Sequence, residues 1–94
     1  MDPRAYRYRL GATQTVAVGA ASAANTTAFG AGTRAVRVVS TTACHIKFEN
    51  TPVATTNDAY LPANWVAEYT VSPGEKIAVI QNTAAGNLYV TEMT

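Results

Sequence analysis

The stretch of sequence that decides the fold runs from residue 66 to residue 92: Val-Ala-Glu-Tyr-Thr-Val (66–71), Ser-Pro-Gly-Glu (72–75), Lys-Ile-Ala-Val-Ile-Gln (76–81), Asn-Thr-Ala-Ala-Gly-Asn (82–87) and Leu-Tyr-Val-Thr-Glu (88–92). Runs rich in β-branched and aromatic residues alternate here with turn residues, which is the pattern of strands separated by turns. Pro73 holds φ at about −65° for the second position of a turn, and Gly74 supplies the positive φ that a type II turn requires at the third. The stretch therefore predicts three strands, which we expect to pair as an antiparallel meander.

Two further strands are predicted upstream, at residues 34–41 and 44–48. Both alternate in polarity, and residues 42–43 between them match the length of a hairpin connection. Successive side chains of a strand point to opposite faces, so the pattern also predicts which side chains face the core. In the second strand we expect three inward side chains and three outward ones: Cys44, Ile46 and Phe48 inward, and His45, Lys47 and Glu49 outward.

A polar segment and a short strand separate this pair from the three strands of residues 66–92. Residues 50–58 are long enough to cross from one sheet to another. Residues 59–61 then predict a short strand, which Pro62 ends because proline cannot donate to a sheet.

The N-terminal third gives two alternating segments and a long stretch of small residues. Residues 4–10 and 14–18 alternate, with Gly11 as the interruption between them. Residues 19–33 predict a loop with one short strand around 26–29. In all, about eight short strands predict an all-β fold, a small antiparallel β-sandwich or jelly-roll-like barrel. We expect residues 11–94 to form this single β domain, with 1–10 as an N-terminal docking arm or first strand.

The composition describes one small domain with few charges. At 94 residues the chain is near the lower limit for a self-sufficient core, and only 14% of its residues are charged, against roughly 25% in an average domain. Its surface must then consist largely of Ala, Thr, Val and Asn. We expect oligomerisation, or permanent docking on a larger assembly, to supply further burial.

The net charge and the cysteine content limit the cellular compartment and the classes of partner that we expect. A net charge of +1 provides no field that would attract nucleic acid or an anionic membrane, and no apolar run of 18 residues is present. The single Cys44 cannot form an internal disulfide, and residues 1–9 lack the apolar region of a secretory signal. We therefore expect a protein made in a reducing cytoplasm, without a nucleic-acid or membrane partner.

No residue pattern indicates an enzyme or a cofactor site. The six acidic residues are not spaced as a catalytic pair, and the chain has no glycine-rich phosphate loop. Cys44 and His45 are adjacent, but neighbours on a strand point apart, and zinc would need two more ligands. We expect a buried thiol, an exposed imidazole, and a non-enzymatic protein without catalytic residues, metal or cofactor. The exception would be a site on a symmetry axis where three copies of His45 meet.

Arginine and tyrosine alternate near the N-terminus, at Arg4, Tyr6, Arg7, Tyr8 and Arg9. This pattern can contact phosphates and stack on bases, but the near-neutral net charge argues against nucleic acid. Tyrosine and arginine are also enriched at the centres of protein interfaces, which favours a docking arm on a partner protein. A first strand with its tyrosines in the core and its arginines in water is the equal alternative.

Tyr60 and Trp65 flank an aromatic-rich loop that holds the only tryptophan of the chain. Aromatic faces stack on sugar rings, so the loop could be a carbohydrate platform, although no acidic or amide cluster accompanies it. A core plug or part of a subunit interface is the interpretation that the composition favours.

Four stretches resemble small structural proteins of tailed bacteriophages: residues 37–46, 60–64, 71–80 and 88–93. They cover framework strands and turns. The resemblance implies a head-decoration (cement) protein of β-sandwich or jelly-roll type, on the capsid surface of the virion, that docks on the lattice of the major capsid protein and is often trimeric. A tail or head-fibre component, or a carbohydrate-binding module that contacts host glycan, is the alternative. We expect the partner to be contacted by Arg4, Tyr6, Arg7, Tyr8, Arg9, Tyr60 and Trp65.

Overall fold

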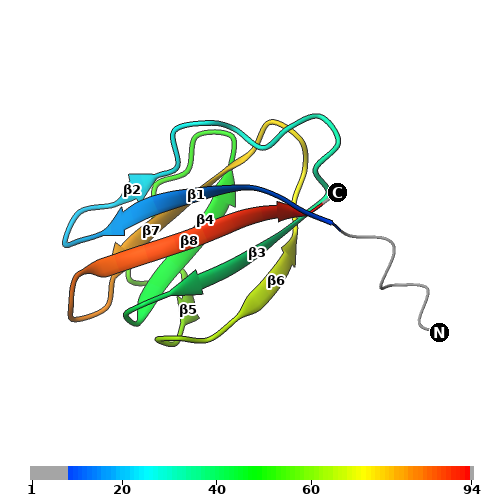
Figure 1. Ribbon diagram of the computed structural model, residues 1–94. Coiled ribbons are helices and arrows are strands. Elements are labelled where there is room, and N and C mark those ends of the chain that lie inside the picture. The colour runs from blue at the N-terminus through cyan, green and yellow to red at the C-terminus, as the bar shows by residue number, and fades with distance from the viewer. Residues whose placement is uncertain (1–8, 94) are drawn as a thin grey trace.

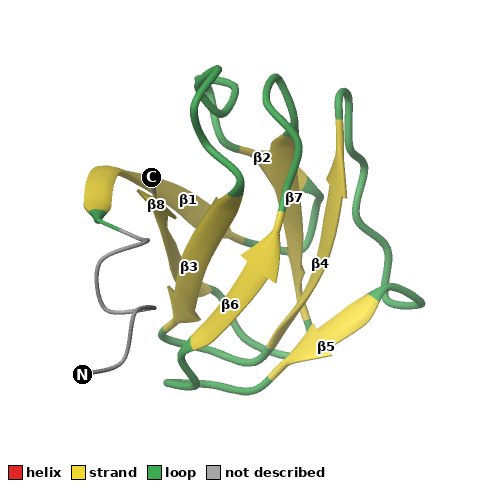
Figure 2. Ribbon diagram, turned by 90° about the vertical axis from the view of Figure 1, so that its right-hand side faces the viewer, coloured by secondary structure: helices red, strands yellow, loops and turns green. Residues whose placement is uncertain are grey.

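Two four-stranded antiparallel sheets pack face to face in the computed structural model, which describes residues 9–93 (Figures 1 and 2). The described residues contain no helix. The first sheet has the order β1 (Leu10–Val18), β8 (Gly86–Met93), β3 (Ala35–Ser40) and β6 (Ala67–Thr70). The second has the order β2 (Ala23–Ala24), β7 (Lys76–Gln81), β4 (Cys44–Glu49) and β5 (Ala59–Leu61). The predicted all-β sandwich is therefore confirmed.

The strand order identifies the sandwich as a jelly roll. Six of the seven connections carry the chain from one sheet to the other, and only β4 and β5 are consecutive strands of one sheet. Every strand pair is antiparallel. The orders 1-8-3-6 and 2-7-4-5 are those of an eight-stranded double-sheet jelly roll.

The predicted strands are correct in most of their bounds, but several predicted connections are wrong. Residues 66–92 form no meander, because β6 and β8 belong to the first sheet and β7 to the second. The 41–43 connection likewise crosses between sheets and makes no hairpin. Stacked sheets lie about 10 Å apart, which three extended residues span, so link length alone does not separate the two cases. The 50–58 segment joins neighbouring strands of one sheet and does not cross.

Two details of the N-terminal third also differ from the prediction. β1 runs through Gly11, with a register irregularity between Leu10 and Thr13 in place of a break. The short strand lies at Ala23–Ala24, where it pairs with β7, and not around residues 26–29. Asn25 explains this shift, because its amide oxygen accepts from Ile77 N (2.8 Å) and its amide nitrogen donates to Thr27 O (2.6 Å). The chain therefore leaves the sheet at this residue.

The predicted turn at residues 72–75 is confirmed. Gly74 has φ +88°, and Glu75 N donates to Ser72 O at 3.2 Å. The turn is tied to the β2–β3 loop, because Gly74 N donates to Phe29 O and Phe29 N donates to Glu75 O, both at 2.9 Å. Pro73 and Gly74 thus fix the shape of the turn, and the hydrogen bonds to the β2–β3 loop fix the position of the turn.

The core consists of the inward-facing side chains of both sheets. Alternation along each strand selects them, as the predicted inward positions Cys44 and Ile46 illustrate. At one end of the core three rings are in contact, with centroid distances of 6.5 Å for Phe29–Phe48 and 5.4 Å for Phe48–Tyr69. The buried members of the cluster are Val16, Val18, Phe29, Val36, Val38, Cys44, Ile46, Leu61, Val71, Ile77, Val79, Leu88 and Val90.

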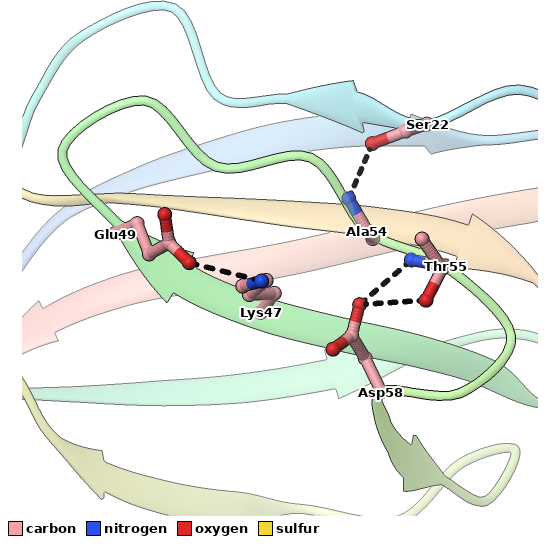
Figure 3. A network of polar contacts seen from close by, with 6 residues as sticks. All are labelled: Ser22, Lys47, Glu49, Ala54, Thr55 and Asp58. Carbon is pink, nitrogen blue, oxygen red and sulfur yellow. Dashed lines mark hydrogen bonds and ion pairs between the residues drawn. The ribbon is translucent and has the colours of Figure 1, made fainter.

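A strap formed by residues 50–58 covers part of the outer face of the second sheet (Figure 3). Ala54 N donates to Ser22 Oγ at 2.8 Å, next to β2, and Thr55 N donates to Asp58 Oδ2 at 2.7 Å within the strap itself. Ala78 points away from the core, since it lies between two inward residues of β7, yet it is fully buried. The strap therefore gives this sheet a partly covered outer side.

The strap also explains why the prediction of an exposed His45 is wrong. His45 does point away from Cys44, as alternation requires, but it is only 9% exposed. Its Nδ1 lies 3.0 Å from Asp58 O and its Nε2 lies 3.1 Å from Asn82 Oδ1, and the ring meets Tyr60 edge-on at 5.5 Å. Residues 13 and 37 positions away enclose the ring, so its burial does not follow from the local pattern.

Cys44 should be chemically inert in the folded protein. It is completely buried, and burial raises the pKa of its thiol despite a hydrogen bond with Ser40 that lowers it. Less of the thiol is therefore ionised at a given pH, and the reagent has no access. We expect iodoacetamide at about pH 8 to label Cys44 only after unfolding in urea, as measured by intact mass. Complete labelling of the native protein within minutes would contradict this.

The Asn25 side chain should contribute more to the stability of the fold than its small size suggests. It is 3% exposed, and its side chain holds Ile77 N and Thr27 O together. In Asn25→Ala the buried Ile77 N–H loses its side-chain acceptor, so we expect a loss of about 1–3 kcal/mol in the free energy of unfolding. Urea denaturation measures it. Thr26→Ala, at the exposed neighbouring position, is the matched control and should change the value by less than about 0.5 kcal/mol.

Candidate functional site

Four connections meet at one end of the sandwich, which we call the loop end: residues 19–22, 41–43, 62–66 and 82–85. Because the strands pair antiparallel, the odd-numbered strands end at this end of the sandwich and the even-numbered strands begin there. Each of the four connections therefore crosses from one sheet to the other at the same end (Figure 1). The strand orders place the connections in a row, from 62–66 at one edge through 41–43 and 82–85 to 19–22 at the other.

Backbone hydrogen bonds join each connection of the row to the next. Asn64 N donates to Ser40 O at 2.7 Å, beside the 41–43 connection. Asn82 N donates to Ala43 O at 3.1 Å, and Gln81 N donates to Gly19 O at 2.9 Å. Because every connection is bonded to its neighbour, the loop end forms one continuous surface whose backbone is held in place.

The loop end carries no Asp, Glu, Lys or Arg in any of its four connections. Its exposed residues are Ala, Thr, Asn, Pro, Val and Trp. The opposite end is charged: Arg34, Glu49, Glu75 and Lys76 lie in or beside its loops, and Glu92 Oε1 accepts from Gly30 N at 2.9 Å. Burying a charge-free surface against a partner avoids the cost of desolvating ions, and charged residues are depleted from interface cores for this reason.

Trp65 is the largest apolar side chain on the loop end and is 61% exposed. The turn that presents it includes Asn64 in the left-handed region, with φ 59°, and Trp65 N donates to Pro62 O at 3.4 Å. Val66 beside it is 48% exposed. The interpretation of this loop as a core plug is therefore wrong, while an interface and a sugar platform both stay predictions.

Tyr60 lies next to the loop end but faces a different direction. It is on β5, pairs with His45 across the sheet, and is 53% exposed on the outer face of the second sheet. Leu61, the next residue, points into the core and is 1% exposed. Tyr60 and Trp65 thus border one corner of the molecule, at the edge where β5 ends.

Of the predicted arm the structure describes only Arg9 and Leu10, and these lie at the end of the domain opposite the aromatic loop. Arg4, Tyr6, Arg7 and Tyr8 lie outside the described residues, so their predicted role is not tested. Arg9 is exposed and directly precedes β1, whose first residue, Leu10, pairs with Met93 at the end opposite the loop end. The structure therefore does not bring Arg9 together with Tyr60 and Trp65.

The prediction from sequence named Trp65 and Tyr60 but missed the rest of the loop end. Three of its connections, 19–22, 41–43 and 82–85, hold only small and amide side chains that carry no motif. A signal was nonetheless present. Each of the four connections lies in a window without a single charged residue, at 10–33, 38–46, 59–67 and 77–91.

Three observations on residues 9–93 concern groups that could take part in acid–base or metal chemistry. The described residues contain no group of three His, Cys, Asp or Glu that could hold a metal ion. Both ring nitrogens of His45 face oxygen atoms within 3.1 Å, so this ring is engaged within the fold. Lys47 pairs with Glu49 at 2.9 Å on the outer face, and that hydrogen bond raises the pKa of Lys47.

Comparisons with known proteins found no matching family model, no similar curated protein and no similar solved structure. Among residues 9–93 there is no helix long and apolar enough to cross a membrane.

Gly86 should be required for the packing of the loop end. A Cβ at this position would lie 2.5 Å from Thr41 Oγ1 and 2.7 Å from Thr42 Oγ1. Thr41 Oγ1 accepts from Asn87 N at 3.0 Å, so rotating it away breaks a hydrogen bond. We expect Gly86→Ala to lower the free energy of unfolding by about 1–3 kcal/mol in urea denaturation.

Gly19→Ala is the matched control for this substitution. It lies on the same loop end, but a Cβ there would meet no atom within 4 Å. An equal loss of stability in the two variants would show that close packing against Thr41 and Thr42 is not the cause.

Proposed function

We propose that this protein is a non-enzymatic structural component of a bacteriophage virion, a decoration protein that docks on the major capsid protein through its loop end. The observation that carries the proposal is the combination found there: a continuous surface bonded through its backbone, without charged residues, with Trp65 61% exposed at one edge. Exposing this side chain to water does not stabilise the free domain, whereas covering it with a partner protein would contribute favourable free energy to binding.

The physical mechanism of such a protein is burial across a seam. A protein that binds the assembled shell and not its separated subunits stabilises the shell by mass action. Tryptophan is among the residue types that contribute most to binding energy at protein interfaces. The hydrogen bonds between the connections of the loop end add to the affinity, because a held backbone loses little conformational entropy on binding.

The jelly-roll fold supports this proposal by analogy alone. Jelly rolls are common in viral capsid and lectin domains, but a fold does not determine a function. The proposal includes a homotrimer on the local three-fold positions of the shell, which would match the symmetry of the lattice and cover further low-charge surface. It also places the protein on the capsid surface of the virion.

A carbohydrate-binding role, as part of a tail or head fibre, is the second candidate. The observation that favours it is the exposed amide of Asn64 next to Trp65, with hydroxyl and amide side chains along the rest of the row and no charge. Neutral sugars are bound by such a combination of an aromatic face and uncharged hydrogen-bonding groups.

Trp65→Ala separates a binding role from a structural one. Since the side chain is mostly exposed, we expect the free energy of unfolding to change by less than about 0.5 kcal/mol. Affinity for capsid shells purified without this protein, measured by co-sedimentation, should fall at least tenfold, or about 1.4 kcal/mol.

The matched control is Val53→Ala on the strap, an apolar side chain that is 63% exposed but does not belong to the loop end. It should leave shell binding unchanged. Equal shell binding by wild type and Trp65→Ala would refute docking through the loop end. Binding of a neutral glycan on an array, lost in Trp65→Ala, together with no binding to shells, would establish the second candidate instead.

A further inference from the structure

One of the four edge strands of the sandwich is long and uncharged. The edge strands are β1 and β6 in the first sheet and β2 and β5 in the second (Figure 1). β2 has two residues, β5 has three and is followed by Pro62, and β6 has four and carries the exposed Glu68. Short length, proline and charge are devices that keep sheet edges from pairing with other chains. β1 has nine residues, with no charge and no proline.

The backbone of β1 has hydrogen-bonding groups left on the side away from β8. Residues 13–18 pair with β8 in continuous register, and among the described residues no other segment hydrogen-bonds to the backbone of β1. In an antiparallel strand every second residue directs its N–H and C=O to the same side, so about three residues of this stretch direct both groups to the free edge. That edge can therefore accept one more strand.

The largest polar side chain of β1, Gln14, is bound on the other side of the strand's inner face. Its side-chain amide donates to Thr27 O at 2.9 Å and accepts from Thr27 N at 3.1 Å. These two hydrogen bonds turn the side chain toward the segment that follows β2. The Gln14 amide therefore does not satisfy the backbone groups at the free edge of β1.

The residue pattern of β1 is compatible with a second copy of itself. About a two-fold axis at Thr15, each Thr15 lies opposite the other, and Thr13 lies opposite Ala17 of the second copy on the same outer face. Since the strand has no charge, no register places like charges opposite each other. Paired threonines already occur in this sheet, where Thr13 Oγ1 lies 2.9 Å from Thr91 Oγ1.

We propose that two copies of this protein associate through residues 13–17 of β1, which pair antiparallel about a two-fold axis at Thr15. The two first sheets, of four strands each, then form one continuous sheet. Five paired residues on each strand give about four to six hydrogen bonds, at the lower end of the range for a specific interface. We therefore expect a reversible dimer with a dissociation constant in the micromolar range.

This inference does not rest on the proposed function. A two-fold axis across antiparallel strands directs the two loop ends in opposite directions, so both cannot meet one shell surface. The dimer is a form of the free protein, and it has to dissociate before several copies dock side by side on a shell.

The test places charges on the proposed axis. Thr15→Lys and Thr15→Glu each put like charges opposite each other, whereas an equal mixture of the two variants puts a lysine opposite a glutamate. Thr15 is exposed, so circular dichroism should show the native fold in both variants. We expect the wild-type mass in sedimentation to rise from one chain to two between about 1 µM and about 1 mM. The dissociation constant should be at least tenfold higher in each variant alone and should recover in the mixture.

Thr70→Lys is the matched control, because Thr70 is an exposed threonine on the other edge strand of the same sheet. It should dimerise like the wild type. A wild-type mass of one chain up to about 1 mM would overturn the proposal. So would a dimer or trimer that is equally stable in the wild type and in both Thr15 variants, or a mixture that stays as dissociated as its two components. None of these results changes the expected effect of Trp65→Ala on shell binding, so the two proposals fail separately.

Discussion

Each sheet of this protein can bury its apolar face only against the other sheet, and the rest of the structure depends on that pairing. Six of the seven connections cross between the sheets, so neither sheet is built from consecutive strands alone. Leu88 and Val90 of the last strand pack in the same cluster as Ile77 and Val79 of the strand before it, from the opposite side. Stability in so small a domain then comes from one shared interior, as expected when little surface is available for burial.

The strands could be predicted from the sequence because their signal is local. The alternation of apolar and polar side chains identified the strand segments, and this alternation correctly placed Cys44 and Ile46 inward. The topology could not be predicted, because a three-residue link such as 41–43 fits a hairpin and a crossing equally well. His45 was misplaced for a related reason. Its cover comes from Asp58 and Asn82, which no local pattern associates with it.

The candidate site was predictable only in its aromatic residues. Trp65 and Tyr60 are recognisable from the sequence, because large aromatic side chains strongly affect packing whether they lie in a core or at an interface. The rest of the loop end becomes a surface only when the jelly roll brings four separate connections into one row. The low charge of the chain was visible from its composition, but the segregation of charge to the other end is a property of the fold.

The arrangement of the first sheet has a consequence for synthesis in the cell. β8 lies between β1 and β3, so the first strand to be made pairs with the last, and the third strand pairs with that same last strand. While residues 86–93 are still inside the ribosome, β1 has no partner in the first sheet, and the core lacks Leu88 and Val90. Such non-local pairing makes folding slow compared with folds built from local contacts. Folding is therefore an event that follows translation of the domain, and nascent chains present unpaired strands to one another wherever many ribosomes translate the same message.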